Sequence, residues 1–387
     1  MQKTIAEINH YTSFTVNPLS LPEQTYELYS VPSYDSGLPE IIQGKEIGST
    51  KVAVRENDVL VCKINPRINR VWVVKHHTQH PLIASSEWIV IRSPENDCEY
   101  LKWYFMSPKF HRMMVSQVTG IGGSLTRAQP KQVATYPVPI PDLPTQRRIA
   151  TTLDKVSEGI ALCKQMLADL DELVKSQFVE LFGDPAKNSM GWPMKALGEC
   201  LDSIGNGKSF VCESHSREGE FPAVLKLSAA TTGTYQPDEN KAVMDEDDFV
   251  DSAEVHDGDL LFTRKNTPEL VGMAAYVFKT PPKLMMPDIV FRLNTDEKHC
   301  KKIYLWQLIN HTMFRPCIQA LANGSAKSMS NISKEKLMKL FIPVPDMDIQ
   351  ERFIDFFMQA DKSKFAVQQQ LMELETLKES LMQEYFG

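Results

Sequence analysis

Short clusters of Lys, Arg, Asn, Ser and Thr carry most of the side chains in this sequence that point to chemistry. Arginine and lysine pair with phosphates, and amide, hydroxyl and guanidinium groups pair with base edges, so such clusters are typical of nucleic-acid contact. In the N-terminal half the candidates are Lys63, Asn65, Arg67, Arg70, Ser124, Thr126 and Arg127. In the C-terminal half they are Lys208, Ser209, Arg264, Lys265, Asn266, Lys327 and Ser328. Each cluster by itself fits a solvated loop equally well.

Motifs for catalysis or metal binding are incomplete. Gly207-Lys208-Ser209 is similar to the end of a phosphate-binding loop, but that motif needs a glycine at position 202, which is Asp. The histidines in residues 76–80 have no neighbouring carboxylate, so we predict a surface loop there. We find neither the Asn/Asp-Pro-Pro-aromatic motif of methyltransferases nor a nuclease-like carboxylate cluster. We therefore predict no catalytic residue and no metal site.

Composition excludes several classes of protein. The net charge of −7 argues against a protein that coats nucleic acid by charge alone. The seven cysteines are scattered and form no C-x-x-C pair, which indicates a reducing compartment. No apolar run approaches the ~18 residues of a membrane span, and no signal peptide is visible at the start. We expect a cytoplasmic protein without membrane contact.

The sequence repeats itself at an offset of 204 positions. Residues 138–149 align with residues 342–353, and the register holds without a gap to Phe182-Gly183 and Phe386-Gly387. Weaker matches at the same offset, such as Tyr100 with Tyr304, extend the repeat backwards. The predicted organisation is a domain over residues 1–144, a helix over 145–183, a second domain over 184–348 and a second helix over 349–387.

The two segments of about 40 residues read as long helices, each with one apolar stripe at alternating steps of three and four. The first stripe comprises Ile149, Leu153, Val156, Ile160, Cys163, Leu167, Leu170, Val174, Phe178 and Leu181. The second comprises Phe353, Phe357, Ala360, Val367, Leu371, Leu374, Leu377 or Leu381, and Tyr385, with Lys364 as a break. Pairing of the two helices would bury both stripes.

The two longer segments read as α+β domains. We expect strands over residues 59–64, 72–74 and 88–91 in the first and over 259–263, 274–278 and 289–293 in the second. An amphipathic helix should follow in each, over residues 99–115 and 299–321.

These features together resemble the specificity (S) subunit of type I restriction–modification systems, over essentially the whole chain. The resemblance rests on a Pro-x-Pro segment followed by Gln and Arg that opens a long helix ending in Phe-Gly, present after each of two domains. The segment Gly-Asp-Leu-Leu-Phe-Thr-Arg at 258–264 and the Trp-x-x-x-x-Leu-Gly-Glu pattern at 192–199 are also similar to that family.

The resemblance implies a non-catalytic reader of double-stranded DNA. Each α+β domain would be a target recognition domain for one half of a bipartite, asymmetric site, and the candidate loops as a set would contact the DNA. The helices would form an antiparallel coiled coil and dock two methyltransferase (M) subunits. The M subunits would carry S-adenosylmethionine and methylate adenine, and restriction (R) subunits would complete the complex.

The same resemblance implies that the chain itself binds no cofactor and that residues identical in both helices bind the partners, so we expect Gln146, Arg148, Gln350 and Arg352 to do so. Two alternatives stay open from the residues alone. One is a coiled-coil interaction scaffold without a DNA-reading role, and the other is an enzyme with an unrecognised site.

Overall fold

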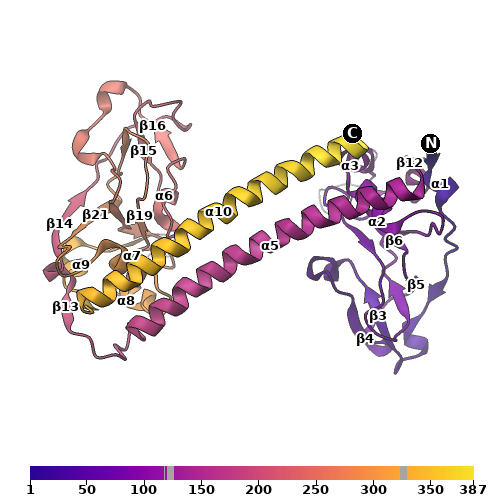
Figure 1. Ribbon diagram of the computed structural model, residues 1–387, viewed down its shortest axis with the longest axis horizontal. Helices are drawn as coiled ribbons and strands as arrows, with labels where there is room; N and C mark the ends of the chain where they lie inside the picture. The colour runs from indigo at the N-terminus through magenta and orange to yellow at the C-terminus, as the bar shows by residue number, and fades with distance from the viewer. Residues whose placement is uncertain (117, 120–125, 323–328) are drawn as a thin grey trace. The chain divides into compact units, whose positions relative to one another are not determined.

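The computed structural model describes residues 1–116, 118–119, 126–322 and 329–387. The chain forms two compact units (Figure 1). The first contains residues 1–165 and 367–387, and the second contains residues 166–366. Each unit holds one α+β domain, a part of the first long helix and a part of the second.

The two long helices have the predicted places and lengths. Helix α5 (Leu143–Phe182) and helix α10 (Met347–Phe386) each contain 40 residues and begin 204 positions apart. Pro144 lies in the first turn, where no intrahelical hydrogen bond is lost, and Gly183 ends α5 with φ of 73°. Helix α5 leads out of the first unit and α10 leads back into it, so the helices run antiparallel within each unit (Figure 1).

Most of the predicted stripe is buried, and its exceptions are informative. Leu377 is 45% exposed, and Met382 and Phe386 are buried in its place near the end of α10. Lys364, predicted as a break, forms an ion pair with Asp171 of the facing helix. A charged residue in the stripe is tolerated because the opposite helix supplies its counter-ion.

The first domain contains two main sheets. One is the sheet β2-β5-β8-β3-β4, and the other is β7-β6-β9. Their strands are β2 (Thr15–Val16), β3 (Thr25–Tyr29), β4 (Glu40–Gln43), β5 (Lys51–Ala53), β6 (Val59–Cys62), β7 (Val71–Val73), β8 (Leu82–Ala84) and β9 (Trp88–Ile91). Strand β1 (Gln2–Thr4) pairs with β12 (Pro137–Pro139), and β10 (Val118–Thr119) pairs with β11 (Arg127–Ala128). The short helices are α1 (Ile5–Ile8) and α4 (Pro130–Val133).

The second domain also has two main sheets, of four and three strands where the first has five and three. Its main sheets have the orders β14-β21-β17-β19 and β16-β15-β20. Their strands are β14 (Leu201–Asn206), β15 (Ala223–Leu225), β16 (Asn240–Ala242), β17 (Leu260–Thr263), β19 (Ala274–Tyr276), β20 (Leu284–Met285) and β21 (Val290–Thr295). Strand β13 (Met194–Ala196) pairs with β23 (Phe341–Pro343), and β18 (Lys265–Asn266) pairs with β22 (Ser330–Asn331). The short helices are α6 (Ser228–Thr231) and α9 (Lys334–Met338).

The helix predicted after the strands is broken in both domains. In the first, α2 (Cys98–Met106) and α3 (Pro108–Ser116) are separated at Ser107, because a residue before proline is driven out of the helical region. In the second, α7 (Lys302–Asn310) ends at His311 and α8 (Arg315–Gln319) begins anew. The single helices expected over 99–115 and 299–321 are therefore wrong, although their positions are right.

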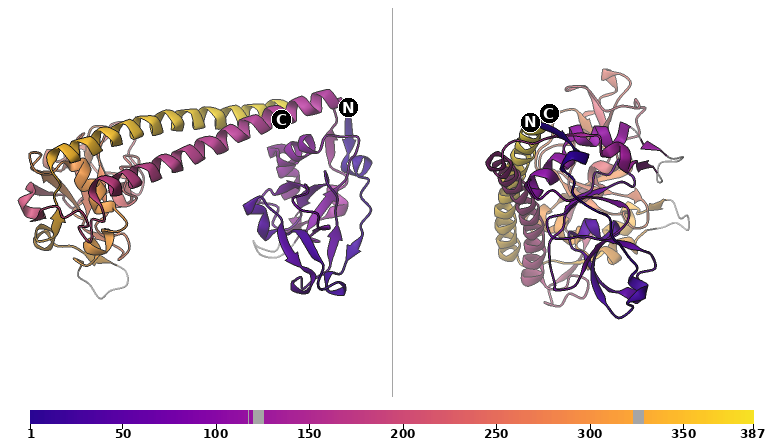
Figure 2. Two further views of the ribbon diagram at one scale, coloured as in Figure 1. Left: turned by 60° about the horizontal axis from the view of Figure 1, so that its bottom comes forward. Right: turned by 90° about the vertical axis from the view of Figure 1, so that its right-hand side faces the viewer.

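One aromatic contact occurs twice and joins each domain to the end of a long helix. Phe386 of α10 packs against Tyr100, with ring centroids 5.7 Å apart, and Phe182 of α5 packs against Tyr304 at 4.9 Å. The hydroxyls of Tyr100 and Tyr304 donate to the carbonyls of Pro139 and Pro343, both at 2.7 Å. Figure 2 shows both chain termini at the helix side of the first unit, where this contact anchors α10.

Replacing Phe182 with Ala should destabilise the second unit strongly. Phe182 is 1% exposed among Phe178, Tyr304 and Phe353, so truncation leaves a cavity and costs about 3–5 kcal/mol of unfolding free energy. Denaturant unfolding measures the loss. Leu173→Ala is the control on the same helix, because Leu173 is 47% exposed, and its effect should stay within about 0.5 kcal/mol. Equal losses in the two variants would contradict the anchoring role.

The second unit should lose stability on acidification because of His311. Its ring stacks on Phe178 at 4.9 Å, and burial, with Lys175 nearby, lowers the pKa of His311 although Asp184 opposes the shift. An unfolded histidine has a pKa of about 6.5, so the stabilisation is complete above that pH and is lost as pH falls through the folded value. The melting temperature should therefore fall more steeply between pH of about 7.5 and about 5.5 in the wild type than in His311→Gln. His215→Gln, which removes an exposed histidine of the same unit, should keep the wild-type slope.

Candidate nucleic-acid interface

Two predicted segments of the first unit meet where strand β6 ends. Ile64 and Arg127 form an antiparallel bridge, and the Asn65 amide donates to the Thr126 carbonyl at 2.8 Å. Asn65 has φ of 47°, which asparagine tolerates better than most residues. The residues that follow β6 and strand β11 therefore lie side by side, although they are far apart in the sequence.

The cations at this place differ in how tightly they are held. A guanidinium nitrogen of Arg127 donates to Glu87 at 2.9 Å, and the Lys63 ammonium donates to the Ser86 carbonyl at 2.6 Å. Arg67 is exposed and has no ion-pair or hydrogen-bond partner within the part of the chain that the structure describes. The cluster thus combines cations held by neighbouring groups with one that is not held by any group in the described part of the chain.

Buried polar atoms without hydrogen-bond partners gather around the same cluster. Among the described residues, Arg70 Nε, Glu87 Oε2 and Thr126 Oγ1 are such atoms. Native proteins pair most buried polar groups, since an unpaired one costs about 1–3 kcal/mol.

The second unit brings the equivalent segments together. Strand β18, which follows β17, pairs with β22, and the Ile332 amide donates to the Arg264 carbonyl at 2.8 Å. The Arg264 guanidinium lies 5.0 Å above the ring of Phe291, and its Nε donates to Asn331 Oδ1 at 3.3 Å. The ring and the amide hold the guanidinium plane in one orientation.

The loop that carries Lys208 joins this second cluster. The Lys208 amide donates to the Met286 carbonyl at 3.1 Å, and the Arg264 amide donates to the Ile289 carbonyl at 3.0 Å. A Cβ atom at Gly207 would lie only 2.0 Å from the Pro287 carbonyl oxygen, so glycine is required there. Lys208 and Ser209 are exposed, and they flank residues 286–289 from the side opposite Arg264.

An equivalent ion pair lies at the start of the strand that leads to each cationic cluster. In the first domain Arg92 donates two hydrogen bonds to Asp58, at 2.8 and 2.7 Å, just before β6 begins. In the second, Arg292 Nε lies 2.9 Å from Asp259 before β17. Each pair fixes the start of the strand whose far end leads into the cationic cluster.

Two of the predicted contact residues face the interior. Thr126 and Asn266 are each 6% exposed, and Asn266 donates to Thr231 Oγ1 at 3.2 Å while accepting from the Thr267 amide at 2.8 Å. These two side chains support their loops from within. Ser124, Lys327 and Ser328 lie outside the described residues. The remaining predictions stay predictions for Lys63, Asn65, Arg67, Arg70, Arg127, Lys208, Ser209, Arg264 and Lys265.

Glu87 is the residue of this region that the sequence does not reveal. It orients Arg127 across a separation of 40 positions, and its second carboxylate oxygen is one of the unpaired buried atoms. No local motif marks such a pair, because the contact exists only after β6 and β9 have paired.

The structure gives Gln146 and Gln350 a role different from the expected partner binding. Gln146 is 1% exposed; its amide oxygen accepts from the Asp97 amide at 2.9 Å, and its amide nitrogen donates to the Pro141 carbonyl at 2.9 Å. Gln350 is fully buried and does the same with Lys301 at 2.9 Å and Pro345 at 2.8 Å.

Each glutamine therefore ties the first turn of a long helix to the loop before α2 or α7, and its burial is incompatible with a direct partner contact. Arg148 and Arg352 are exposed and stay predictions.

Among the residues that the structure describes, no group of three or more His, Cys, Asp or Glu side chains is arranged to hold a metal ion. The loop with His76 and His77 is exposed, and its backbone is held by the buried carboxylate of Glu27, which accepts from the amides of His77 and Thr78. Within the described ranges, no helix is both long and apolar enough to cross a membrane.

Comparison with known proteins agrees with this architecture. A family model described as the type I restriction modification DNA specificity domain matches residues 4–172 and again residues 190–376. The specificity subunit of the type I restriction enzyme EcoEI from Escherichia coli is 31% identical over 189 residues. That match covers 48% of this chain and spans about a third (32%) of the relative's length.

Solved structures share the fold. A chain of a type I restriction–modification system, from work on its assembly and conformational transition, aligns with a TM-score of 0.59 at 19% identity. It covers all of this chain and 97% of that one. The S subunit of a type I system from M. genitalium aligns with a TM-score of 0.60 at 12% identity, over all of this chain and 96% of that one.

Two α+β domains, each tied to both long helices, define a duplicated two-domain chain. The chain belongs to the family of type I restriction–modification DNA specificity proteins, since the family model covers both repeats.

Replacing Gln350 with Ala should destabilise the second unit even though no partner is present. The Lys301 amide and the carbonyls of His299 and Pro345 lose the side-chain partner that Gln350 supplies, which costs about 1–3 kcal/mol of unfolding free energy. Arg352→Ala, two positions along the same helix, is the matched control and should change it by less than about 0.5 kcal/mol. An unchanged unfolding midpoint for Gln350→Ala would contradict the structural role of Gln350 and favour the partner binding expected from the sequence.

Proposed function

We propose that this chain is the non-catalytic, DNA-reading subunit of a type I restriction–modification complex. Each recognition domain reads one half of a bipartite, asymmetric site in double-stranded DNA. Two M subunits, which carry S-adenosylmethionine, then methylate adenine at that site, and R subunits cut DNA that lacks the mark. The chain itself binds no cofactor. It acts in the cytoplasm, where its seven unpaired cysteines stay reduced.

The observation that carries this proposal is the repeated meeting of two remote loops at the end of one strand. In both units the cations lie at the exit of an equivalent strand, β6 or β17, and are oriented by neighbours such as Glu87 or Phe291. The backbone frame is the same, whereas the side chains on it differ. A shared backbone arrangement with different base-contacting side chains suits two half-sites of different sequence.

Exposed apolar side chains on the long helices support docking of the M subunits there. Seven large ones are between 42% and 68% exposed: Leu162, Met166 and Leu173 on α5, and Met358, Phe365, Met372 and Leu377 on α10. Exposed apolar groups gathered on one element are typical of protein interfaces. Leu173 and Leu377 occupy equivalent positions at the offset of 204, so each helix offers one matching apolar side chain, which suits two identical partners.

The acidic balance of the chain makes DNA binding dependent on those partners. Affinity for DNA scales with the number of phosphates neutralised, and a chain with net charge −7 neutralises few of them. We expect weak binding by the isolated chain and tight, sequence-specific binding by its complex with M.

Replacing Arg264 and Lys265 together with Ala should erase recognition of one half-site only. The complex of this chain with its co-expressed M subunit would be used to select duplexes from a random-sequence library. The wild type should enrich a bipartite motif, and the double variant should enrich the other half alone, because each lost base contact costs about 1–3 kcal/mol of discrimination.

Lys279→Ala, which removes a lysine that is 90% exposed elsewhere in the same unit, should leave the motif intact. A double variant that assembles with M and still selects the full motif would contradict the reading role of this cluster. A wild-type complex that selects no motif would leave a coiled-coil scaffold as the better account.

A further inference from the structure

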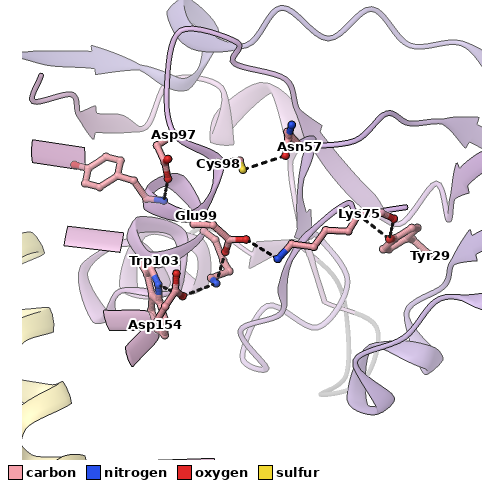
Figure 3. Close-up of polar contacts among 10 residues, drawn as sticks. Tyr29, Asn57, Lys75, Asp97, Cys98, Glu99, Trp103 and Asp154 are labelled. Carbon is pink, nitrogen blue, oxygen red and sulfur yellow. Dashed lines mark hydrogen bonds and ion pairs between the residues drawn. The ribbon is translucent and has the colours of Figure 1, made fainter. Parts of the chain in front are cut away.

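A chain of charged contacts holds helix α2 of the first domain against α5 (Figure 3). Asp154 of α5 accepts a hydrogen bond from the Trp103 indole at 2.9 Å and another from the Lys102 ammonium at 3.1 Å. Lys102 also pairs with Glu99, and Glu99 binds Lys75 at 3.0 Å. Asp154 is thus the residue of α5 that connects these charged contacts of the domain to the long helix.

Helix α10 joins the same junction from its other side. The Lys378 ammonium lies 5.0 Å from the centre of a Trp103 ring, and the Lys102 ammonium lies 4.9 Å from it. Trp103 is only 4% exposed, so α2, α5 and α10 converge on one buried indole. Burial would lower the pKa of Lys102, but the carboxylates of Glu99 and Asp154 outweigh it and raise that pKa. Burial and neighbouring lysines lower the pKa of Lys378.

The second unit has an apolar junction at the same positions. With the offset of 204, the four charged residues of the first junction correspond to apolar ones. Glu99, Lys102, Asp154 and Lys378 are replaced by Ile303, Trp306, Met358 and Val174. Trp306 packs against Phe357 of α10 at 5.4 Å and donates to the Gly233 carbonyl at 2.9 Å. The contacts around Trp103 and Trp306 therefore differ in kind, although both domains also share apolar packing with their helices and the second has one ion pair, Lys301 with Glu351 at 3.1 Å, at the start of α7.

Salt weakens the charged junction of the first unit but does not weaken the apolar junction of the second. The side chains of Asp154, Lys102 and Glu99 are 33%, 21% and 23% exposed, so ions in solution reach them and screen their attraction. Burial of apolar rings, in contrast, is not weakened by added sodium chloride. The first domain should loosen from its helices as salt rises, whereas the second should not.

We propose that Asp154 is a positioning residue that holds the first recognition domain on α5 and α10 through a salt-sensitive junction. Because of it, base selectivity at one half-site depends on ionic strength more steeply than at the other, beyond the salt dependence that both share through phosphate contacts. Only this consequence for half-sites rests on the proposed function; the junction itself is a property of the folded chain.

Hydrogen exchange of the full chain tests the junction without any DNA. Between about 0.1 M and about 1 M NaCl, where the screening length falls from about 10 to about 3 Å, exchange of the α2 amides should rise about fivefold. Exchange of the α7 amides beyond its first turn, away from the Lys301–Glu351 ion pair, should stay unchanged. Equal salt responses in α2 and α7 would overturn the proposal.

Variants at position 154 separate charge from packing. Asp154→Asn keeps an oxygen that can accept from Trp103 and removes the charge, so α2 should exchange fast already at low salt and lose its salt response. Asp154→Glu should restore the response. Glu158→Gln, which removes an exposed acid four positions along α5, should behave as the wild type. A full salt response in Asp154→Asn would also overturn the proposal.

The consequence for DNA reading is measured with the complex and the random library. Raising salt, or introducing Asp154→Asn, should reduce selectivity at least about fivefold at the half-site that the Arg264/Lys265 double variant retains. Selectivity lost at the other half-site would contradict the assignment of Asp154 to the first domain. Failure of the wild type to select any motif would count against the proposed function, while the exchange result would still decide the junction.

Discussion

A buried side-chain amide at the start of each long helix is the constraint on which the rest of this structure depends. Gln146 and Gln350 each bind one backbone amide and at least one carbonyl of the chain around them, and thereby fix where a helix leaves its domain. The end of the other helix is fixed in the same domain by Phe386 or Phe182. Each domain therefore holds both helices, one by its first turn and one by its last. The cationic loops can differ freely because they lie at the far ends of strands from these anchors.

The two units share one backbone arrangement but differ in the side chains that it carries. The tyrosine that meets the helix end, the ion pair before the central strand and the loop pairing at its exit occur in both units. The groups at the exit are not equivalent: Arg127 is oriented by a carboxylate and Arg264 by an aromatic ring and an amide. The junctions to the helices have diverged too, from charged contacts around Trp103 to aromatic packing around Trp306. The two domains thus share a backbone plan and carry different charged groups and different junctions to the helices.

The parts of the fold that follow from local spacing were accessible from the sequence. The steps of three and four, with Pro144 and Gly183 at the boundaries, predict α5 to within two residues, and the repeat transfers that prediction to α10. The broken helices at Ser107 and His311 were missed because an amphipathic pattern continues across the break. Gln146 and Gln350 were assigned to partner binding because identity between repeats does not distinguish a buried anchor from a surface contact. Glu87 carries no local signal, since its partner arrives from a distant strand.

The most direct test of the central claim is a genome-wide map of adenine methylation in cells that express this chain with its M subunit, compared with cells that express M alone. The account predicts a new bipartite, asymmetric motif that is methylated only when the chain is present. An unchanged methylation pattern, with the complex shown to assemble, would contradict the claim that this chain reads DNA sequence.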